Sequence, residues 1–356
     1  MSAGPDGDRP TGLATAAAGT LGGGAPQPDD LTGRRGRGRR RSGGGKGGGT
    51  MARAEARAGF AFISPTLVIV VAVVVLPILW TVALAFQELR LIRLRTAGFI
   101  GDFTLGNFEE VLSSSGFWSS LVTTLIYATL GTASAIGLGL VAALALRSSF
   151  PGRTLVRGAM LMPYVAPVVA ATFVWGVMLN PQFGIVNHWG TGVLGWDEPV
   201  AFLSQRTSEA SVLGLSFDVP TALLTVIAFE MWRSFPFAFL FITARLQAVP
   251  GTLEEAGLVD GATPTQRFRY IVLPQLLPTI AVLALLRFIW TFNNFDDIYL
   301  LTGGGAGTEV VSVRVFNYLV SRGDIGAASA QALVLAGVLI VLVALYFRFA
   351  AKDEES

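Results

Sequence analysis

A polar cluster interrupts the apolar stretch Phe292–Gly305, which reads FNNFDDIYLLTGGG. Two asparagines and two aspartates stand in it, at Asn293, Asn294, Asp296 and Asp297. Polar and ionisable groups at membrane depth are costly and usually face a cavity or a pathway. Amides and carboxylates beside aromatic rings suit a polyhydroxylated ligand, because hydroxyls take directional hydrogen bonds and sugar C–H faces stack on rings.

The spacing in this stretch predicts a shared helix face. Asn293 and Asn294 precede Asp297 by four and three residues, the separations of neighbours on a helix surface. The candidate substrate-binding residues are Asn293, Asn294, Asp297, Phe292 and Tyr299. Polar packing between helices explains the same residues equally well, so the residues alone leave both interpretations open.

A second charged group, Glu230 and Arg233, lies in another apolar stretch. The two are three residues apart and can neutralise each other on a helix. Pro236 follows and would free backbone carbonyls. A structural ion pair is favoured here over direct substrate contact, and Arg287 of a later apolar stretch is a candidate to join it.

Few residues of this chain are of the types that enzymes use for catalysis. It has no cysteine and a single histidine, His188, so thiol catalysis, disulfides and His clusters are excluded. The run GGGKGGG around Lys46 lacks the Ser or Thr that a phosphate loop needs after its Lys. We therefore expect no catalytic residue, no bound metal and no cofactor; ATP and Mg²⁺, if used, bind to another chain.

Composition indicates an all-α integral membrane protein. The 356 residues are 52% hydrophobic and 14% charged, whereas soluble domains carry roughly 25% charged residues. Apolar segments near 20 residues long match a ~30 Å hydrocarbon core. Six spans are predicted, near residues 60–86, 118–146, 155–179, 221–247, 279–301 and 328–350, with a kink at Pro77 in the first.

The segment 250–278, between the fourth and fifth spans, carries too many charges to lie in lipid. Pro250 helps to end the preceding span, because proline cannot donate to a continuing helix. Glu254 and Glu255 would open a new helix, where the dipole favours carboxylates. Gly261 permits a sharp turn after it. An ordinary amphipathic loop helix is the alternative to a functional one.

The spacing here resembles the coupling loop of permeases of binding-protein-dependent ABC importers, whose pattern is E-A-A, three residues, G, nine residues, I-x-L-P. Six of its seven fixed positions match, and Gly257 replaces the second Ala. The resemblance implies a helix that docks in a groove of an ATPase subunit, with Glu255 paired to a basic residue there. The implied coupling residues are Glu255, Ala256, Gly257, Asp260, Gly261 and Ala262.

The stretch FNNFDDIYLLTGGG is also similar to a span of carbohydrate-importer permeases of the maltose-importer type. The similarity continues through Thr308–Glu309 and covers about residues 58–350. It implies that Asn293 and Asn294 contribute to a sugar site, whereas Asp297 is proposed from its position alone.

Charge placement sets the expected topology. With the N-terminus inside, eighteen of the 26 Lys and Arg residues lie inside and six outside; without the N-terminal tail the bias falls to eight against six. Both termini and the coupling loop are then cytoplasmic. Residues 1–52, rich in Gly and Arg, are expected to be a disordered tail, with anionic-lipid binding as an alternative. Residues 58–350 form the transmembrane domain and 351–356 a cytoplasmic C-terminus.

The sequence thus predicts a multi-pass permease subunit of an ATP-driven importer in the plasma (inner) membrane, for a sugar or oligosaccharide. Its implied partners are a second homologous permease, two ATP-binding subunits that hydrolyse ATP, an extracellular solute-binding protein and the lipid bilayer, with no nucleic acid. The alternatives are a permease for another polyol-like solute such as a glycerol phosphate, an ion-coupled secondary transporter, and a membrane enzyme using Asp296 and Asp297.

Overall fold

The computed structural model describes residues 48–92, 103–212 and 215–353. Contacts within the chain separate residues 1–64 from a larger unit, residues 65–356. Most of the predicted tail lies outside the described residues. Its last residues, 48–52, are helical, because α1 (Gly48–Val70) begins at Gly48.

Helices long and apolar enough to cross a membrane confirm the predicted architecture. In the described part of the chain there are five, or six if one bent pair is a single span. The five cover Gly59–Ala85, Ser115–Ala145 (α4), Thr221–Gln247 (α8), Pro264–Phe292 and Ile325–Arg348, the last within α14 (Ile325–Asp353). The bent pair is α5 (Arg153–Val165) and α6 (Val168–Met178).

The third predicted span is therefore not one straight helix. The axes of α5 and α6 differ by 97°. The break falls at Ala166, whose ψ of 136° is extended, directly before Pro167. A proline ring disfavours the helical conformation in the residue before it, so the Ala-Pro pair explains the turn.

Two other spans contain a π-helical turn beside a proline. In the first, Val71–Val75 separates α1 from α2 (Leu76–Ala85), with Pro77 at the start of α2. In the fifth, Phe268–Val272 separates α10 (Pro264–Arg267) from α11 (Leu273–Phe292). Wider π turns accommodate a following proline that has no N–H to donate.

The core of the larger unit lies where α4 packs against α8 and α11. Gly139 of α4 sets how closely the first two helices approach. A Cβ added at Gly139 would lie 2.8 Å from the backbone nitrogen of Phe239 and 2.7 Å from the Cβ of Ala238. Small residues permit such close helix packing in membranes, so α4 and α8 meet almost backbone to backbone.

Short elements fill the connections between the spans. They are α3 (Gly106–Ser113), α7 (Ile185–Gly192), α9 (Gly251–Val259), α12 (Asp296–Thr302) and α13 (Val311–Val320). One antiparallel hairpin, β1 (Ser208–Val212) with β2 (Leu215–Val219), departs from the all-helical pattern, and Ser208 pairs with Val219. Alternation over so few residues is too short to stand out in the sequence.

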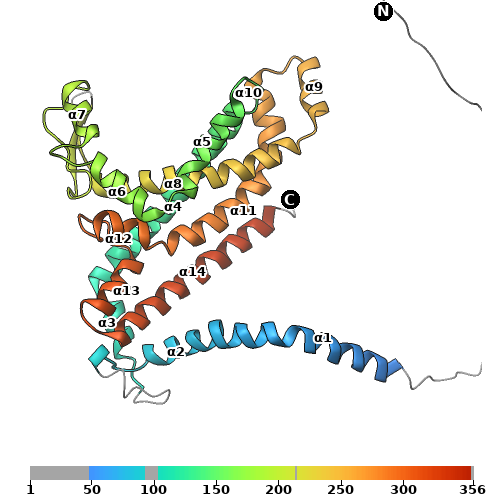
Figure 1. Cartoon of the computed structure of the whole chain (residues 1–356), viewed down its shortest axis with the longest axis vertical. Coiled ribbons are helices and arrows are strands. Elements are labelled where there is room, and N and C mark those ends of the chain that lie inside the picture. The colour runs from blue at the N-terminus through green and yellow to red at the C-terminus, as the bar shows by residue number, and fades with distance from the viewer. Residues whose placement is uncertain (1–47, 93–102, 213–214, 354–356) are drawn as a thin grey trace, which may run out of the picture. The chain divides into compact units, whose positions relative to one another are not determined.

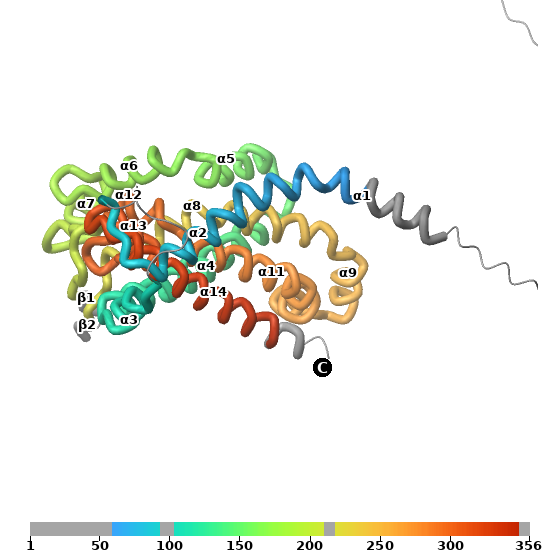
Figure 2. Tube along the Cα trace, turned by 90° about the horizontal axis from the view of Figure 1, so that it is seen from below, coloured from blue at the N-terminus to red at the C-terminus, as the bar shows by residue number. Residues whose placement is uncertain are grey.

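The short elements lie at different ends of the helical bundle. Figure 1 places α7 and α12 at one end and α9 at the other. Figure 2, from a perpendicular direction, again separates α7 and the hairpin from α9. The predicted coupling segment and the polar cluster of the fifth span are thus at opposite ends of the domain.

Candidate functional site

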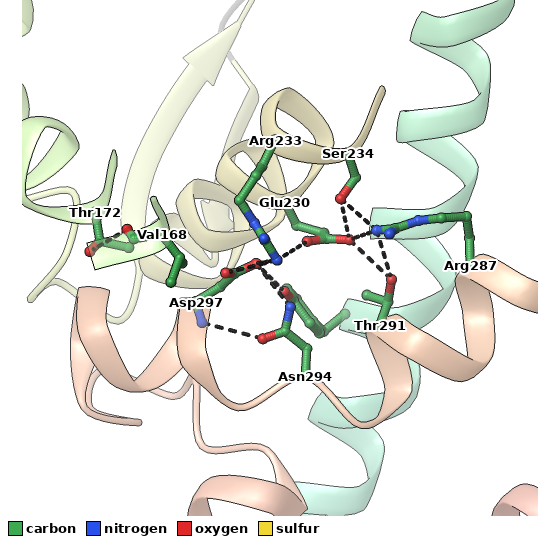
Figure 3. A network of polar contacts seen from close by, with 10 residues as sticks. Val168, Thr172, Glu230, Arg233, Ser234, Arg287, Thr291, Asn294 and Asp297 are labelled. Atoms are coloured by element: carbon green, nitrogen blue, oxygen red, sulfur yellow. Dashed lines mark hydrogen bonds and ion pairs between the residues drawn. The ribbon is translucent and has the colours of Figure 1, made fainter. Parts of the chain in front are cut away.

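Two ion pairs lie among the spans (Figure 3), and of their four residues only Arg233 is half-buried rather than buried. Glu230 of α8 is fully buried and accepts a hydrogen bond from Arg287 of α11. Ser234 and Thr291 each donate to the same oxygen of Glu230 at 3.0 Å. Buried charges persist only when paired and hydrogen-bonded, so this set joins α8 to α11.

The second pair joins α8 to α12. Arg233 lies 3.1 Å from both carboxylate oxygens of Asp297 and 3.8 Å from Glu230. Asn294 donates to Asp297 at 2.9 Å, and the hydroxyl of Tyr127 on α4 lies 3.5 Å from it. The predicted pairing of Glu230 with Arg233 is thus secondary, because each group meets a closer partner from another segment.

Backbone features make room for this ionic network, defined as Glu230, Arg233, Arg287 and Asp297. Gly131 of α4 lies against it: a Cβ there would come 3.1 Å from Cγ of Glu230. Helix α8 runs without interruption through Pro236, which has no N–H to donate to the helix. The network neutralises itself, with two arginines and two carboxylates.

The prediction of a continuous helix through the polar cluster is wrong. Helix α11 ends at Phe292 and α12 begins at Asp296. The side chain of Asn293 turns back to the carbonyl of Ile289 at 2.9 Å. The backbone N–H of Asp297 donates to Asn294 at 3.2 Å. Asparagine side chains that bond nearby backbone groups compete with helix continuation, which explains the break.

The five candidate substrate-binding residues therefore fall into different environments. Asn293 and Tyr299 are exposed, and Asn294 is half-buried. Phe292 and Asp297 are fully buried, the first in the apolar core and the second in the ionic network. Only the exposed members can meet a solute without a rearrangement.

An aromatic cluster surrounds Tyr299. Its ring stacks on Phe295 at 4.8 Å with an interplanar angle of 19°. Phe316 of α13 lies 5.0 Å from Phe295 and 4.9 Å from Tyr299. The sequence pattern pointed to Tyr299, whereas Phe316 comes from a separate helix and was not predicted.

At the opposite end, α9 closes with a glycine turn. Gly261 has a φ of 76°, and the N–H of Ala262 donates to the carbonyl of Gly257 at 2.9 Å. The N–H of Gly261 donates to Leu258 at 3.1 Å. These are the two hydrogen bonds of a Schellman helix end. The glycine at the fixed spacing after Glu255 is thus required by the left-handed turn.

The coupling segment presents one face outward. Glu255, Ala256 and Asp260 are exposed, as are Leu258 at 56% and Val259 at 88%. Gly257 instead faces inward: a Cβ there would lie 2.9 Å from Cδ1 of Ile271. The glycine that replaces alanine in the pattern is a packing position within this chain.

Sequence reasoning missed two ion pairs. Glu254 of α9 pairs with Arg147, just after α4. Glu309 pairs with Arg314 of α13 at 3.2 Å and accepts from Ser120 of α4 at 2.9 Å. The first pair joins residues 107 apart in sequence, and the second joins Glu309 to a residue of the following helix. No local spacing predicts either pair. Among the described residues no group of three or more His, Cys, Asp or Glu side chains could hold a metal ion.

Comparison with known proteins places the chain in a family. Residues 135–352 match the family described as "Binding-protein-dependent transport system inner membrane component". The "Trehalose/maltose transport system permease protein MalF" of Thermococcus litoralis is 32% identical over 286 residues, 80% of this chain and 90% of that protein. The "sn-glycerol-3-phosphate transport system permease protein UgpA" of Agrobacterium fabrum is 34% identical over 263 residues, 72% of this chain and 82% of that protein.

A solved structure has the same fold. It is a chain of a bacterial ABC transporter that imports the acidic polysaccharide alginate, with a TM-score of 0.70 and 20% sequence identity. The match covers 85% of this chain and 98% of that chain. With the family match over most of the helical region, these similarities identify the chain as a member of the binding-protein-dependent transport system inner membrane components.

Proposed function

We propose that this chain is the permease subunit of an ATP-driven importer that translocates a sugar or oligosaccharide delivered by an extracellular solute-binding protein. The observation that most supports this proposal is α9, a separate helix with a defined end on which Glu255, Ala256 and Asp260 are exposed. Its partners would be a second homologous permease and two ATPase subunits, which bind ATP and Mg²⁺. The chain itself performs no catalysis.

Movement of α9 would reach the spans through contacts within this chain. Glu254 attaches α9 to the end of α4 through Arg147, and Gly257 packs on Ile271 before α11. Helices α4 and α11 both contact the buried ionic network, through Tyr127 and Arg287. A rigid shift of α9 would therefore displace two spans at once, a change between two packed states.

The solute would contact the exposed residues near the break between α11 and α12. Asn293 offers an amide, and Tyr299 with Phe295 and Phe316 offers ring faces. Asn294 would be held by Asp297 beside them. In this proposal both termini and α9 are cytoplasmic, in agreement with the positive-inside count, and the α11–α12 break lies toward the other side.

A glycerol phosphate is the second candidate solute, because UgpA covers this chain at a similar identity to MalF. Reconstitution in liposomes with its ATPase, second permease and solute-binding protein tests both. Uptake of labelled trehalose, maltose and glycerol 3-phosphate is compared with and without internal ATP and with an ionophore. ATP-dependent sugar uptake that survives the ionophore supports the proposal; uptake driven by an ion gradient without ATP contradicts it.

A further inference from the structure

A small basic cavity lies where the ends of α4 and α8 meet the start of α5. Its volume is about 210 Å³. It is lined by Ala143, Arg147, Arg153, Arg157, Thr243, Leu246 and Gln247. Three of these residues are arginines and none is acidic. The cavity is separate from the ionic network and from the aromatic cluster around Tyr299.

Several hydrogen-bond donors of the cavity residues have no partner in the part of the chain that the structure describes. The Nε atoms of Arg153 and Arg157 and the hydroxyl of Thr243 are buried without a hydrogen bond. One terminal nitrogen of Arg157 donates to the carbonyl of Leu146, at 3.1 Å. Among the described residues no carboxylate pairs with Arg153 or Arg157, whereas Arg147 is paired with Glu254. Buried donors normally have partners, so the cavity is suited to a ligand with several acceptor oxygens.

The chemistry of that ligand follows from the arginines. Guanidinium groups present planar forks of donors that match phosphate oxygens. Basic pockets between membrane helices near the membrane surface bind acidic lipid head groups. A phosphate group, from a lipid or from solution, would pair with the arginines that line the cavity.

The neighbouring surface favours the lipid. Between Arg153 and Arg157 on α5, Leu155 is 79% exposed and Val156 is 37% exposed. Phe150, before the helix, is 40% exposed. A soluble anion would leave this apolar surface uncovered, whereas the acyl chain of a lipid can pack against it. We propose that the cavity binds the phosphate of an anionic phospholipid through Arg153 and Arg157, with an acyl chain along Leu155.

This site goes beyond the proposed transport function, and it adjoins the coupling segment. Arg147 lines the cavity and also holds Glu254 of α9. A bound phosphate competes with Glu254 for that arginine, because both are anions. Lipid occupancy would therefore alter how firmly α9 is attached to α4.

The test is lipid binding to the purified importer complex in detergent, followed by native mass spectrometry. Phosphatidylglycerol is titrated against phosphatidylcholine for the unaltered protein and for Arg153→Gln/Arg157→Gln. A head-group charge near the surface gains about 1 kcal/mol per arginine, so the double variant should lose ~25-fold in phosphatidylglycerol affinity. The matched control is Arg269→Gln, which removes an exposed arginine outside the cavity and should leave that affinity unchanged.

A charge-preserving variant, Arg153→Lys/Arg157→Lys, guards against misfolding and should keep most of the preference for phosphatidylglycerol. Equal phosphatidylglycerol binding by the unaltered protein and the Gln double variant would overturn the proposal. So would displacement of the lipid by inorganic phosphate at equal concentration, since the site would then take a soluble anion. Unchanged lipid binding with loss of the ATPase subunits from the Gln variant would assign the arginines to a protein contact instead.

Discussion

Arg287 of α11 and Glu230 of α8 form a direct ion pair in which both side chains are buried. They are 57 residues apart in sequence. Ser234 and Thr291, which also bond Glu230, come from the same two helices. The pair therefore fixes the rotation of α8 against α11 in the middle of the domain.

Removing one member of this pair should destabilise the protein strongly. Arg287→Met leaves Glu230 without its closest cation, which typically costs about 3–5 kcal/mol in a buried pair. The double variant Arg287→Met/Glu230→Met should recover most of that loss, because no unpaired charge remains. Thermal unfolding in detergent measures both. If the single and double variants melt alike, the pair does not contribute as a unit.

The sequence pattern named Glu230, Arg233 and Arg287 as a charged group but not their pairing, and it assigned Asp297 to the substrate site instead. Glu230 and Arg233 are near neighbours on α8, and that spacing predicted a pair between them. The structure instead brings Arg287 to Glu230 and Asp297 to Arg233. Both partners arrive through helix packing, which depends on contacts far apart in sequence. The polar residues could be predicted, whereas the way in which the tertiary fold divides them could not.

The close contact of α4 with α8 should make Gly139 intolerant of a side chain. Gly139→Ala places a Cβ against the backbone of Phe239, which cannot move aside as a side chain can. Gly137 is the matched control, since a Cβ there meets nothing within 4 Å. Gly139→Ala should lower the yield and melting temperature of the folded protein, while Gly137→Ala should not. Equal behaviour of the two would contradict the close packing.

Helix existence was easier to predict than helix ends. Five of the six predicted spans are long apolar helices, and the third is present only as the bent pair α5 and α6. The fifth span was extended to Leu301, but it stops at Phe292, where Asn293 and Asn294 bond the backbone. Hydropathy measures partition into lipid and contains no information on such hydrogen bonds. The same breaks decide which side chains are exposed. The separation of the polar cluster into exposed and buried residues could therefore not be predicted from the sequence.

Charge reversal at Glu255 should uncouple transport without preventing assembly of the membrane domain. Glu255 is exposed on α9 and makes no side-chain hydrogen bond or ion pair with the described residues. Lysine there would therefore oppose the proposed basic partner surface without breaking such a bond. Glu209→Lys, at an exposed position of β1, is the control for a charge reversal elsewhere. ATP-driven uptake in liposomes should fall to background for Glu255→Lys alone. Normal uptake by this variant would remove Glu255 from the coupling surface.

The exposed part of the polar cluster should line the solute path. The chain has no cysteine, so single cysteines at Asn293 and Tyr299 can be labelled without background. Both positions are exposed and should react with a water-soluble thiol reagent, while Ile298→Cys, at a position 1% exposed, should not.

Transported sugar should slow labelling at Asn293 and Tyr299, and ATP should change its rate as the domain shifts between states. Asn293→Ala should weaken sugar uptake ~2–10-fold, the effect of one hydrogen bond to a bound hydroxyl. It should leave the melting temperature close to that of the unaltered protein, because the side chain bonds only the carbonyl of Ile289. If sugar protects neither cysteine while uptake remains active, these residues face lipid or a partner, and the solute passes elsewhere.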